Sequence, residues 1–167
     1  MANPRKKFSK IYDKHIDKIY RFIFLKVSSQ EIAQDLTSEV FLRGWKSFKQ
    51  KRDIENPTAF LYQIARNLVV DHYREKGKTR VFSIEYQEIT DPRANLEEKA
   101  ALTSDLNTVQ QALTNIKEDY QTVIIWRYLD DLSILEIAEI LDKSEEAVRV
   151  MLHRALKSLK NEFNQEV

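Results

Sequence analysis

The stretch DLSILEIAEILDKSEEAVRVMLHRALKSLK, residues 131–160, decides the fold of the C-terminal part of the chain. Ser133 with Glu136 three residues later makes a capping box, which predicts that a short helix starts there. After a break at Asp142-Lys143, Ser144 is a suitable cap for a second and longer helix. A short helix, a tight turn and a longer capped helix predict a helix-turn-helix.

The longer helix of this pair is amphipathic. At about 100° per residue its apolar side holds Val148, Leu152, Ala155 and Leu159. The opposite side carries Arg149, Val150, His153, Arg154 and Lys157, with Glu146 among them. These side chains suit base edges, a thymine methyl group and phosphates. The pattern alone fits a DNA-reading helix and equally an amphipathic helix that covers a core.

Composition favours helices throughout. The chain has 167 residues, 43% of them apolar, with two glycines, three prolines and no cysteine. Scarce glycine and proline argue against a turn-rich β fold, and the missing cysteine excludes disulfides and cysteine zinc sites. The sequence shows no secretory leader and no apolar run of membrane-spanning length. We therefore expect a cytosolic protein.

Charge is unevenly distributed along the chain, although the net charge is only +1. Residues 1–80 hold 18 Lys and Arg against 9 Asp and Glu, whereas residues 81–142 hold 4 against 13. Such a basic half followed by an acidic segment favours an anionic partner for the basic half. Scattered solvated charge is the alternative that the count leaves open.

The N-terminal half reads as three helices. Apolar residues recur at helical spacing from Phe8 to Val27, and Ser28 with Glu31 predicts a capping box for the next helix. Asn56-Pro57 predicts the start of a third helix, which should end near Gly77. The sequence therefore predicts an all-α fold of two small helical domains, residues 1–75 and 95–167, joined by a flexible linker, residues 76–94.

The third helix carries a mixed polar face. It holds Gln63, Asn67, Val70 and Arg74, flanked by Tyr62, Arg66 and Tyr73, and Asp71 is placed to orient Arg74. Aromatic rings and guanidinium groups stack on unpaired bases, amides read base edges and cations hold phosphates. A solvated face with partly buried tyrosines is the competing interpretation.

Taken together, the two halves resemble a known family. AQDLTSEVFLRGWKSF and NPTAFLYQIARNLVVDHYREKGK resemble region 2 of the sigma-70 family of bacterial RNA polymerase sigma factors, and residues 131–160 resemble region 4. This two-module layout is similar to the extracytoplasmic-function (ECF) subgroup. The resemblance implies a factor that binds core polymerase and directs promoter-specific initiation.

The resemblance also implies residue roles. Asn67 matches the position that captures a flipped-out −10 base, with Tyr62, Arg66, Asp71 and Arg74 nearby. Arg149, Val150, His153, Arg154 and Lys157 match the helix that reads the −35 element. Contacts to the β′ clamp coiled coil fall on Asp35, Leu36, Glu39, Val40, Phe41 and Arg43, although Leu36, Val40 and Phe41 also fit a core. The β flap and an anti-sigma factor, which can hold such a factor at the membrane, are further partners that the resemblance implies.

Two other classes of protein compete with this interpretation. A stand-alone helix-turn-helix regulator would share the C-terminal pair of helices but has no need of the face around Asn67. An enzyme would need a catalytic or metal-binding constellation. His15, His72 and His153 are far apart in sequence without H-E-x-x-H spacing, and no glycine-rich phosphate loop occurs. We therefore expect no catalytic activity, no metal, no cofactor and no small-molecule substrate.

Overall fold

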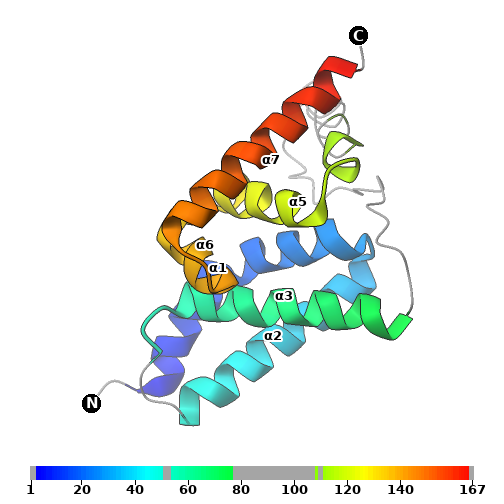
Figure 1. Cartoon of the computed structure of the whole chain (residues 1–167). Coiled ribbons are helices and arrows are strands. Elements are labelled where there is room, and N and C mark those ends of the chain that lie inside the picture. Colours follow the sequence, from blue (N-terminus) through cyan, green and yellow to red (C-terminus); the bar gives the residue numbers. More distant parts are fainter. Residues whose placement is uncertain (1–2, 51–53, 77–107, 109–110, 166–167) are drawn as a thin grey trace, which may run out of the picture.

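The computed structural model describes residues 3–50, 54–76, 108 and 111–165 of the chain. The helices are α1 (Pro4–Val27), α2 (Gln30–Gln50), α3 (Pro57–Lys76), α5 (Glu118–Ile124), the π-helix η1 (Ile125–Leu129), α6 (Ile134–Leu141) and α7 (Glu145–Gln165). Helices α1, α2 and α3 pack together as an N-terminal bundle, and α5, η1, α6 and α7 form a C-terminal bundle (Figure 1). In the described ranges there is no strand. The predicted all-α fold with a C-terminal helix-turn-helix is confirmed.

The junction between α1 and α2 differs by one residue from the sequence prediction. Ser28 adopts a left-handed conformation with φ 57°, and its N–H donates to the Phe24 carbonyl, which ends α1. The N–H of Ile32 donates to Ser29 Oγ at 3.3 Å, so Ser29 caps α2. The predicted capping role of Ser28 is therefore wrong, because two adjacent serines offer the same cap and Ser28 closes the preceding helix.

Helix α3 starts where Asn56-Pro57 predicted. The Ala59 N–H donates to Asn56 Oδ1 at 3.1 Å, and Pro57 occupies the first helical position. The helix continues to Lys76. Except for Lys76, the predicted linker of residues 76–94 lies outside the described residues.

The N-terminal bundle is closely packed around the crossing of α2 and α3. Gly44 is buried in α2, and a Cβ built on it would lie 2.8 Å from Leu61 Cδ2. Leu61 itself is fully buried. A glycine inside a helix costs free energy in isolation, and here the close approach of α3 accounts for it.

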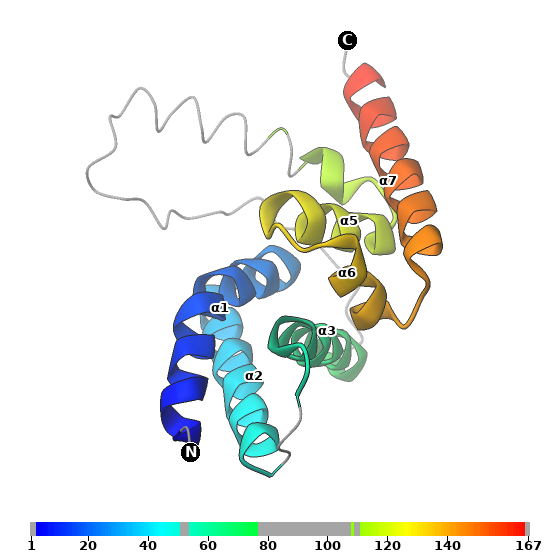
Figure 2. The same cartoon turned by 90° about the vertical axis from the view of Figure 1, so that its left-hand side faces the viewer.

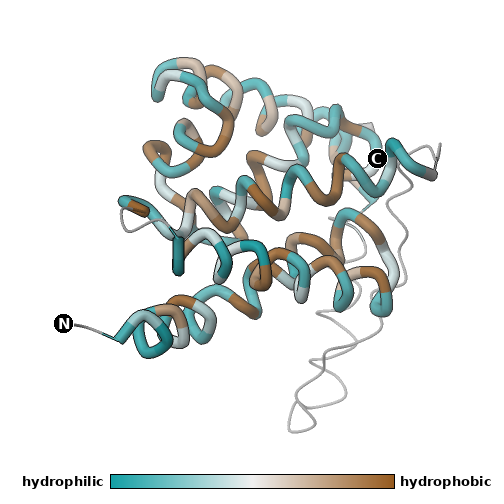
Figure 3. The backbone as a smooth tube through the Cα atoms, turned by 90° about the horizontal axis from the view of Figure 1, so that it is seen from below, coloured by the Kyte–Doolittle hydropathy of each residue, from teal (hydrophilic) through white to brown (hydrophobic). Residues whose placement is uncertain are grey.

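Along the helices, apolar residues alternate with polar ones (Figure 3).

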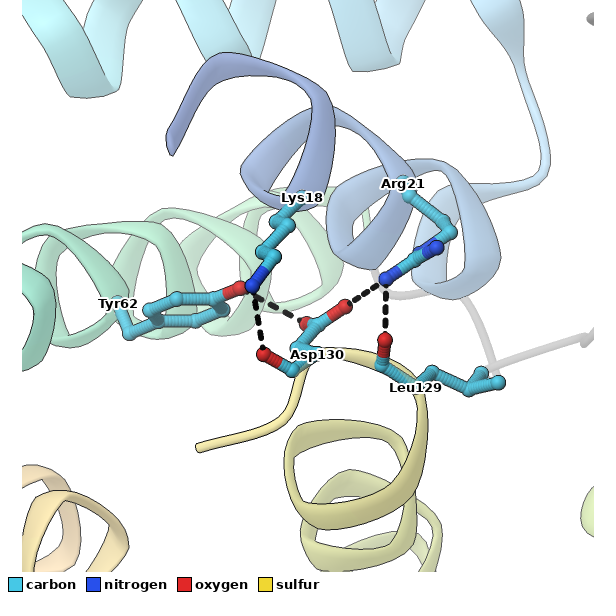
Figure 4. A network of polar contacts seen from close by, with 5 residues as sticks. All are labelled: Lys18, Arg21, Tyr62, Leu129 and Asp130. Atoms are coloured by element: carbon cyan, nitrogen blue, oxygen red, sulfur yellow. Dashed lines mark hydrogen bonds and ion pairs between the residues drawn. The ribbon is translucent and has the colours of Figure 1, made fainter. Parts of the chain in front are cut away.

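The C-terminal bundle contains an irregularity that the sequence pattern did not predict. The helix that begins at Glu118 is α-helical only to Ile124 and then widens into η1. The Asp130 N–H donates to the Ile125 carbonyl at 3.0 Å, five residues back, and the Leu132 N–H donates to Trp126. This wide turn directs Asp130 toward the N-terminal bundle (Figure 4).

The two bundles pack directly on each other. Helix α6 lies against α3, which is seen end-on between α6 and the pair α1 and α2 in Figure 2. Asn56 Nδ2 donates to Glu139 at 3.2 Å across this contact. Buried apolar residues of both bundles form one continuous cluster. Among the described helices, none combines the length and apolar character needed to cross a bilayer.

Candidate nucleic-acid interface

Helix α7 presents a polar face to solvent. Val148, Leu152 and Ala155 are buried against the rest of the C-terminal bundle. The five side chains predicted to read duplex DNA, Arg149, Val150, His153, Arg154 and Lys157, are all exposed. Cations, an imidazole and an apolar methyl-bearing side chain on one exposed helix face are suited to a major groove. The helix continues away from the other elements toward the C-terminus (Figure 1).

Local hydrogen bonds define both ends of α6 and the start of α7. Ser133 and Glu136 form the predicted capping box, with bonds of 3.0 and 3.1 Å between each side chain and the other residue's N–H. Asp142 takes a left-handed conformation with φ 54°, and the Lys143 N–H donates to the Ala138 carbonyl. Ser144 Oγ accepts from the Ala147 N–H at 3.1 Å and caps α7. The capping predictions for Ser133 and Ser144 are therefore confirmed.

The first turn of α7 is acidic. Glu145 and Glu146 are both exposed there. Carboxylates near a helix N-terminus interact favourably with the helix dipole, so these residues stabilise α7. Local charge on α7 is consequently close to neutral, unlike the basic N-terminal bundle.

The polar face of α3 is divided by the contact between the bundles. Asn67, Asp71 and Arg74 are exposed, whereas Arg66 is half-buried. Arg66 lines two small cavities, of about 140 and 60 Å³, together with Asp119 of α5. The exposed part of α3 therefore offers an amide, a carboxylate and a guanidinium group to solvent.

Tyr62 is not on the exposed face of α3 in this conformation. It is fully buried, and its hydroxyl donates to Asp130 Oδ2 at 2.9 Å. Tyr73, predicted to flank the same face, is also buried, and its hydroxyl donates to the Lys26 carbonyl. Both tyrosines thus differ from the predicted arrangement, because packing of α3 against α1 and the C-terminal bundle covers the sides on which they lie.

Asp130 is the centre of a polar network between the bundles (Figure 4). Its carboxylate accepts from Arg21 Nη2 at 2.6 Å as well as from Tyr62, and its backbone carbonyl accepts from Lys18 Nζ at 3.2 Å. Arg21 Nη2 also donates to the Leu129 carbonyl at 2.6 Å. Two helices of the N-terminal bundle therefore hold the turn that follows η1.

Burial changes the acidity of this network. Desolvation raises the pKa of the Asp130 carboxyl above its ordinary value, and hydrogen bonds from Arg21 and Tyr62 oppose this rise. Burial and the neighbouring Asp130 charge raise the pKa of the Tyr62 hydroxyl, which stays protonated as a donor. Loss of either donor, Arg21 or Tyr62, would leave the buried Asp130 carboxylate less well compensated and would weaken the contact between the bundles.

The residues predicted to contact a polymerase clamp divide into two groups on α2. Val40 and Phe41 are buried, and Phe41 packs against the rings of Phe8 and Tyr12. The remaining four, Asp35, Leu36, Glu39 and Arg43, are exposed or half-buried. Glu39 accepts from Arg43 Nε at 2.8 Å. Val40 and Phe41 therefore have a core role, and the outer side of α2 is available to a partner.

The sequence interpretation missed the residues that join the bundles. Lys18, Arg21 and Lys26 come from α1, while Glu118 and Asp130 come from the acidic segment. The uneven charge along the chain was a signal for such pairing. It did not identify the partners, because they are 92 or more residues apart in sequence.

Comparison with known proteins gives consistent results for both bundles. Residues 11–79 match the family model "Sigma-70 region 2", and residues 106–159 match "Sigma-70, region 4". The ECF RNA polymerase sigma factor SigW of Bacillus subtilis is 30% identical over 166 residues, which cover 93% of this chain and 88% of SigW.

Solved structures with a similar fold include two complexes. RpoE of Bartonella quintana, bound to the anti-sigma factor NepR, matches with a TM-score of 0.75 at 19% identity, covering 95% of this chain and 98% of RpoE. CnrH, bound to the cytosolic domain of CnrY, matches with a TM-score of 0.70 at 17% identity, covering 98% of this chain and 91% of CnrH. At these identities the likeness is one of fold.

Proposed function

Since the chain belongs to the sigma-70 family and is an ECF RNA polymerase sigma factor, we propose which of its surfaces carry out initiation. The chain binds core polymerase and promoter DNA, with α3 acting at the −10 element and α7 at the −35 element. The observation that carries this division is the presence of two separate exposed polar helix faces, one in each bundle.

Helix α3 captures an unpaired base. Asn67 supplies an amide that pairs with a base edge, and Asp71 and Arg74 lie on the same exposed part of the helix. Tyr62 and Arg66 complete the site, with a ring for stacking and a guanidinium for phosphate. Because Tyr62 is buried beside Asp130, its participation requires the bundles to move apart.

Helix α7 reads duplex DNA in the major groove. Arg149, Val150, His153 and Arg154 contact base edges, and Lys157 contacts phosphate. The exposure of all five side chains supports this role. The acidic first turn and near-neutral charge favour weak binding by this helix alone, so polymerase is needed to hold it at the promoter.

Polymerase binds the outer side of α2. Asp35, Leu36, Glu39 and Arg43 contact the β′ clamp coiled coil directly, and Val40 and Phe41 support them from the core. The C-terminal bundle contacts the β flap. Residues 1–75 and 95–167 are the two functional modules, and residues 76–94 connect them.

We further propose regulation by an anti-sigma factor, as RpoE and CnrH have partners in their solved complexes. The chain acts in the bacterial cytoplasm, where polymerase and promoter are, and an anti-sigma factor can hold it at the membrane. Its role is binding, without catalysis, cofactor or small-molecule substrate.

Transcription with purified core polymerase tests this function. A genomic promoter library is transcribed with core alone and with core plus the protein, and new run-off products identify its promoters. We expect products that depend on the protein. If the protein fails to bind core and directs initiation from no promoter, it acts instead as a stand-alone helix-turn-helix regulator, and duplex binding without polymerase would support that alternative.

A further inference from the structure

One side of α1 carries a line of cations. Its basic residues are spaced three or four apart and are Lys7, Lys10, Lys14, Lys18 and Arg21. At 100° per residue they fall within an arc of about 80° around the helix. Lys18 and Arg21, at one end of the line, donate to Asp130 (Figure 4). We call the other three residues, Lys7, Lys10 and Lys14, the lysine stripe.

The lysine stripe is open to solvent. All three of its side chains are exposed, and none of them forms an ion pair with another described residue. The nearest acidic residues in sequence, Asp13 and Asp17, lie to one side of the stripe. The first turns of α1 extend away from α5, α6 and α7 (Figure 2). The stripe is therefore accessible in the free protein.

The stability of α1 does not account for these lysines. The first turn of α1 holds no acidic residue and includes Lys7, whereas the first turns of α2, α5, α6 and α7 are acidic. Cations near a helix N-terminus oppose the helix dipole. Lys10 and Lys14 are four residues apart, where like charges destabilise a helix. An anionic partner would offset both repulsions.

The positive charge of the stripe reaches the start of α3. His15 lies in α1 next to Lys14, and its Nε2 is 2.7 Å from Thr58 Oγ1 in the first turn of α3. Burial is the largest cause of the lowered pKa of His15, and the charges of Lys14 and Lys18 lower it as well, while Glu136 of α6 opposes them. One end of the stripe therefore lies beside the helix proposed to act at the −10 element.

The spacing and chemistry of the stripe suit the backbone of duplex DNA. At 1.5 Å per residue, Lys7 and Lys14 are about 10 Å apart along the helix axis. A DNA strand presents a phosphate about every 3.4 Å along the duplex, so the stripe spans about three phosphates. Lysine ammonium groups hold phosphates without reading bases. No large apolar side chain is exposed on this side of α1, so a lipid layer is a poorer partner.

We propose that the lysine stripe is a third DNA-binding surface, which holds the phosphate backbone of duplex DNA without regard to base sequence. It is separate from the polar faces of α3 and α7 and does not rest on the roles proposed for them. Because the stripe is exposed in the free protein, its binding needs neither polymerase nor a promoter sequence. It adds a salt-dependent contribution to the affinity for DNA.

The salt dependence of DNA binding tests the stripe. The probe is a dye-labelled duplex of random sequence, and its anisotropy is measured with the free full-length protein over a series of sodium chloride concentrations. In Lys10→Gln with Lys14→Gln, the slope of log affinity against log salt should fall by about 2, because each phosphate contact contributes about 0.9. Lys7→Gln alone should lower the slope by about 1.

A matched control removes the same charge from another surface. Lys46 and Lys49 are exposed on α2 and three residues apart. Helix α2 lies on the opposite side of α1 from the stripe, where Tyr12 packs against Phe41. Lys46→Gln with Lys49→Gln should therefore keep the slope of the wild type.

The possible outcomes separate the stripe from its alternatives. A wild type that does not bind the duplex at low salt, an unchanged slope in both stripe variants, or an equal loss in the control would overturn the proposal. Phosphatidylglycerol vesicles are the second probe. If the stripe lysines were needed for vesicle binding and not for duplex binding, the partner would be a membrane surface and the proposal would be wrong. Failure of the wild type to direct transcription would refute the proposed function and leave the measured slopes unchanged.

Discussion

Arg21 Nη2 lies 2.6 Å from Asp130 Oδ1, and this ion pair joins α1 to the turn after η1. Arg21 belongs to the basic residues 1–80 and Asp130 to the acidic residues 81–142. The basic residues that favour an external anionic partner therefore also pair with a carboxylate of the same chain. The same network buries Tyr62, whose hydroxyl donates to Asp130 Oδ2.

Asn67→Ala should reduce open-complex formation. The amide is expected to hold a flipped base, and truncation leaves that base edge unpaired, at a cost of about 1–3 kcal/mol. Permanganate footprinting of the holoenzyme on a promoter found by run-off transcription measures the change. Binding to −35 duplex should be unaffected. Asn161→Ala removes the same group from an exposed position of α7 and should leave melting intact.

Arg149→Ala should have the reverse pattern. Loss of a bidentate contact to guanine should cost about 1–3 kcal/mol and relax preference at one −35 base pair. Holoenzyme affinity for duplexes substituted at each −35 position measures this, with Arg5→Ala as a charge-matched control on α1. Similar losses in melting and duplex binding for both Asn67→Ala and Arg149→Ala would contradict the two-site division.

His15 should make stability depend on pH. The side chain is buried between the Ile11 carbonyl and Thr58 Oγ1, each at 2.7 Å. Burial lowers the pKa of His15 below its ordinary value of 6.5, so the unfolded chain binds a proton more readily. The stabilisation is present above pH 6.5 and is lost as pH falls toward the lower folded value.

Denaturant unfolding at pH 7.5 and 5.5 measures this effect. The wild type should lose unfolding free energy over this interval, by no more than about 1.4 kcal/mol for each pH unit below 6.5, which is the most that a single proton can contribute. His15→Gln should lose less, and His153→Gln, on the exposed face of α7, should behave as the wild type. An unchanged pH dependence in His15→Gln would assign the effect to other groups.

Gly44→Ala should destabilise the N-terminal bundle despite the better helix propensity of alanine. Alanine gains about 0.5–1 kcal/mol in a helix, but its Cβ would meet Leu61 Cδ2 at 2.8 Å in a filled core, where overpacking costs about 1–3 kcal/mol. We expect a net loss of about 1 kcal/mol in thermal or denaturant unfolding. Ser38→Ala, at an exposed position of α2, should cause no loss. Equal or greater stability of Gly44→Ala would mean that Leu61 moves aside freely.

The sequence determined the elements that depend on neighbouring residues. Helical periodicity, the caps at Asn56, Ser133 and Ser144, and the exposed side of α7 follow from interactions within a few residues, so the pattern predicted them. Even there, adjacent serines left the cap of α2 ambiguous by one residue.

Only the tertiary structure decided which residues of the two bundles contact and bury each other. The burial of Tyr62 and the pairing of Asp130 with Arg21 depend on groups 68 and 109 residues apart in sequence. No periodicity encodes such contacts, because a tyrosine or an aspartate on a helix looks the same whether water or another helix lies opposite. Burial against a second bundle changes Tyr62 from an accessible ring into a buried donor, and that change depends on three-dimensional packing.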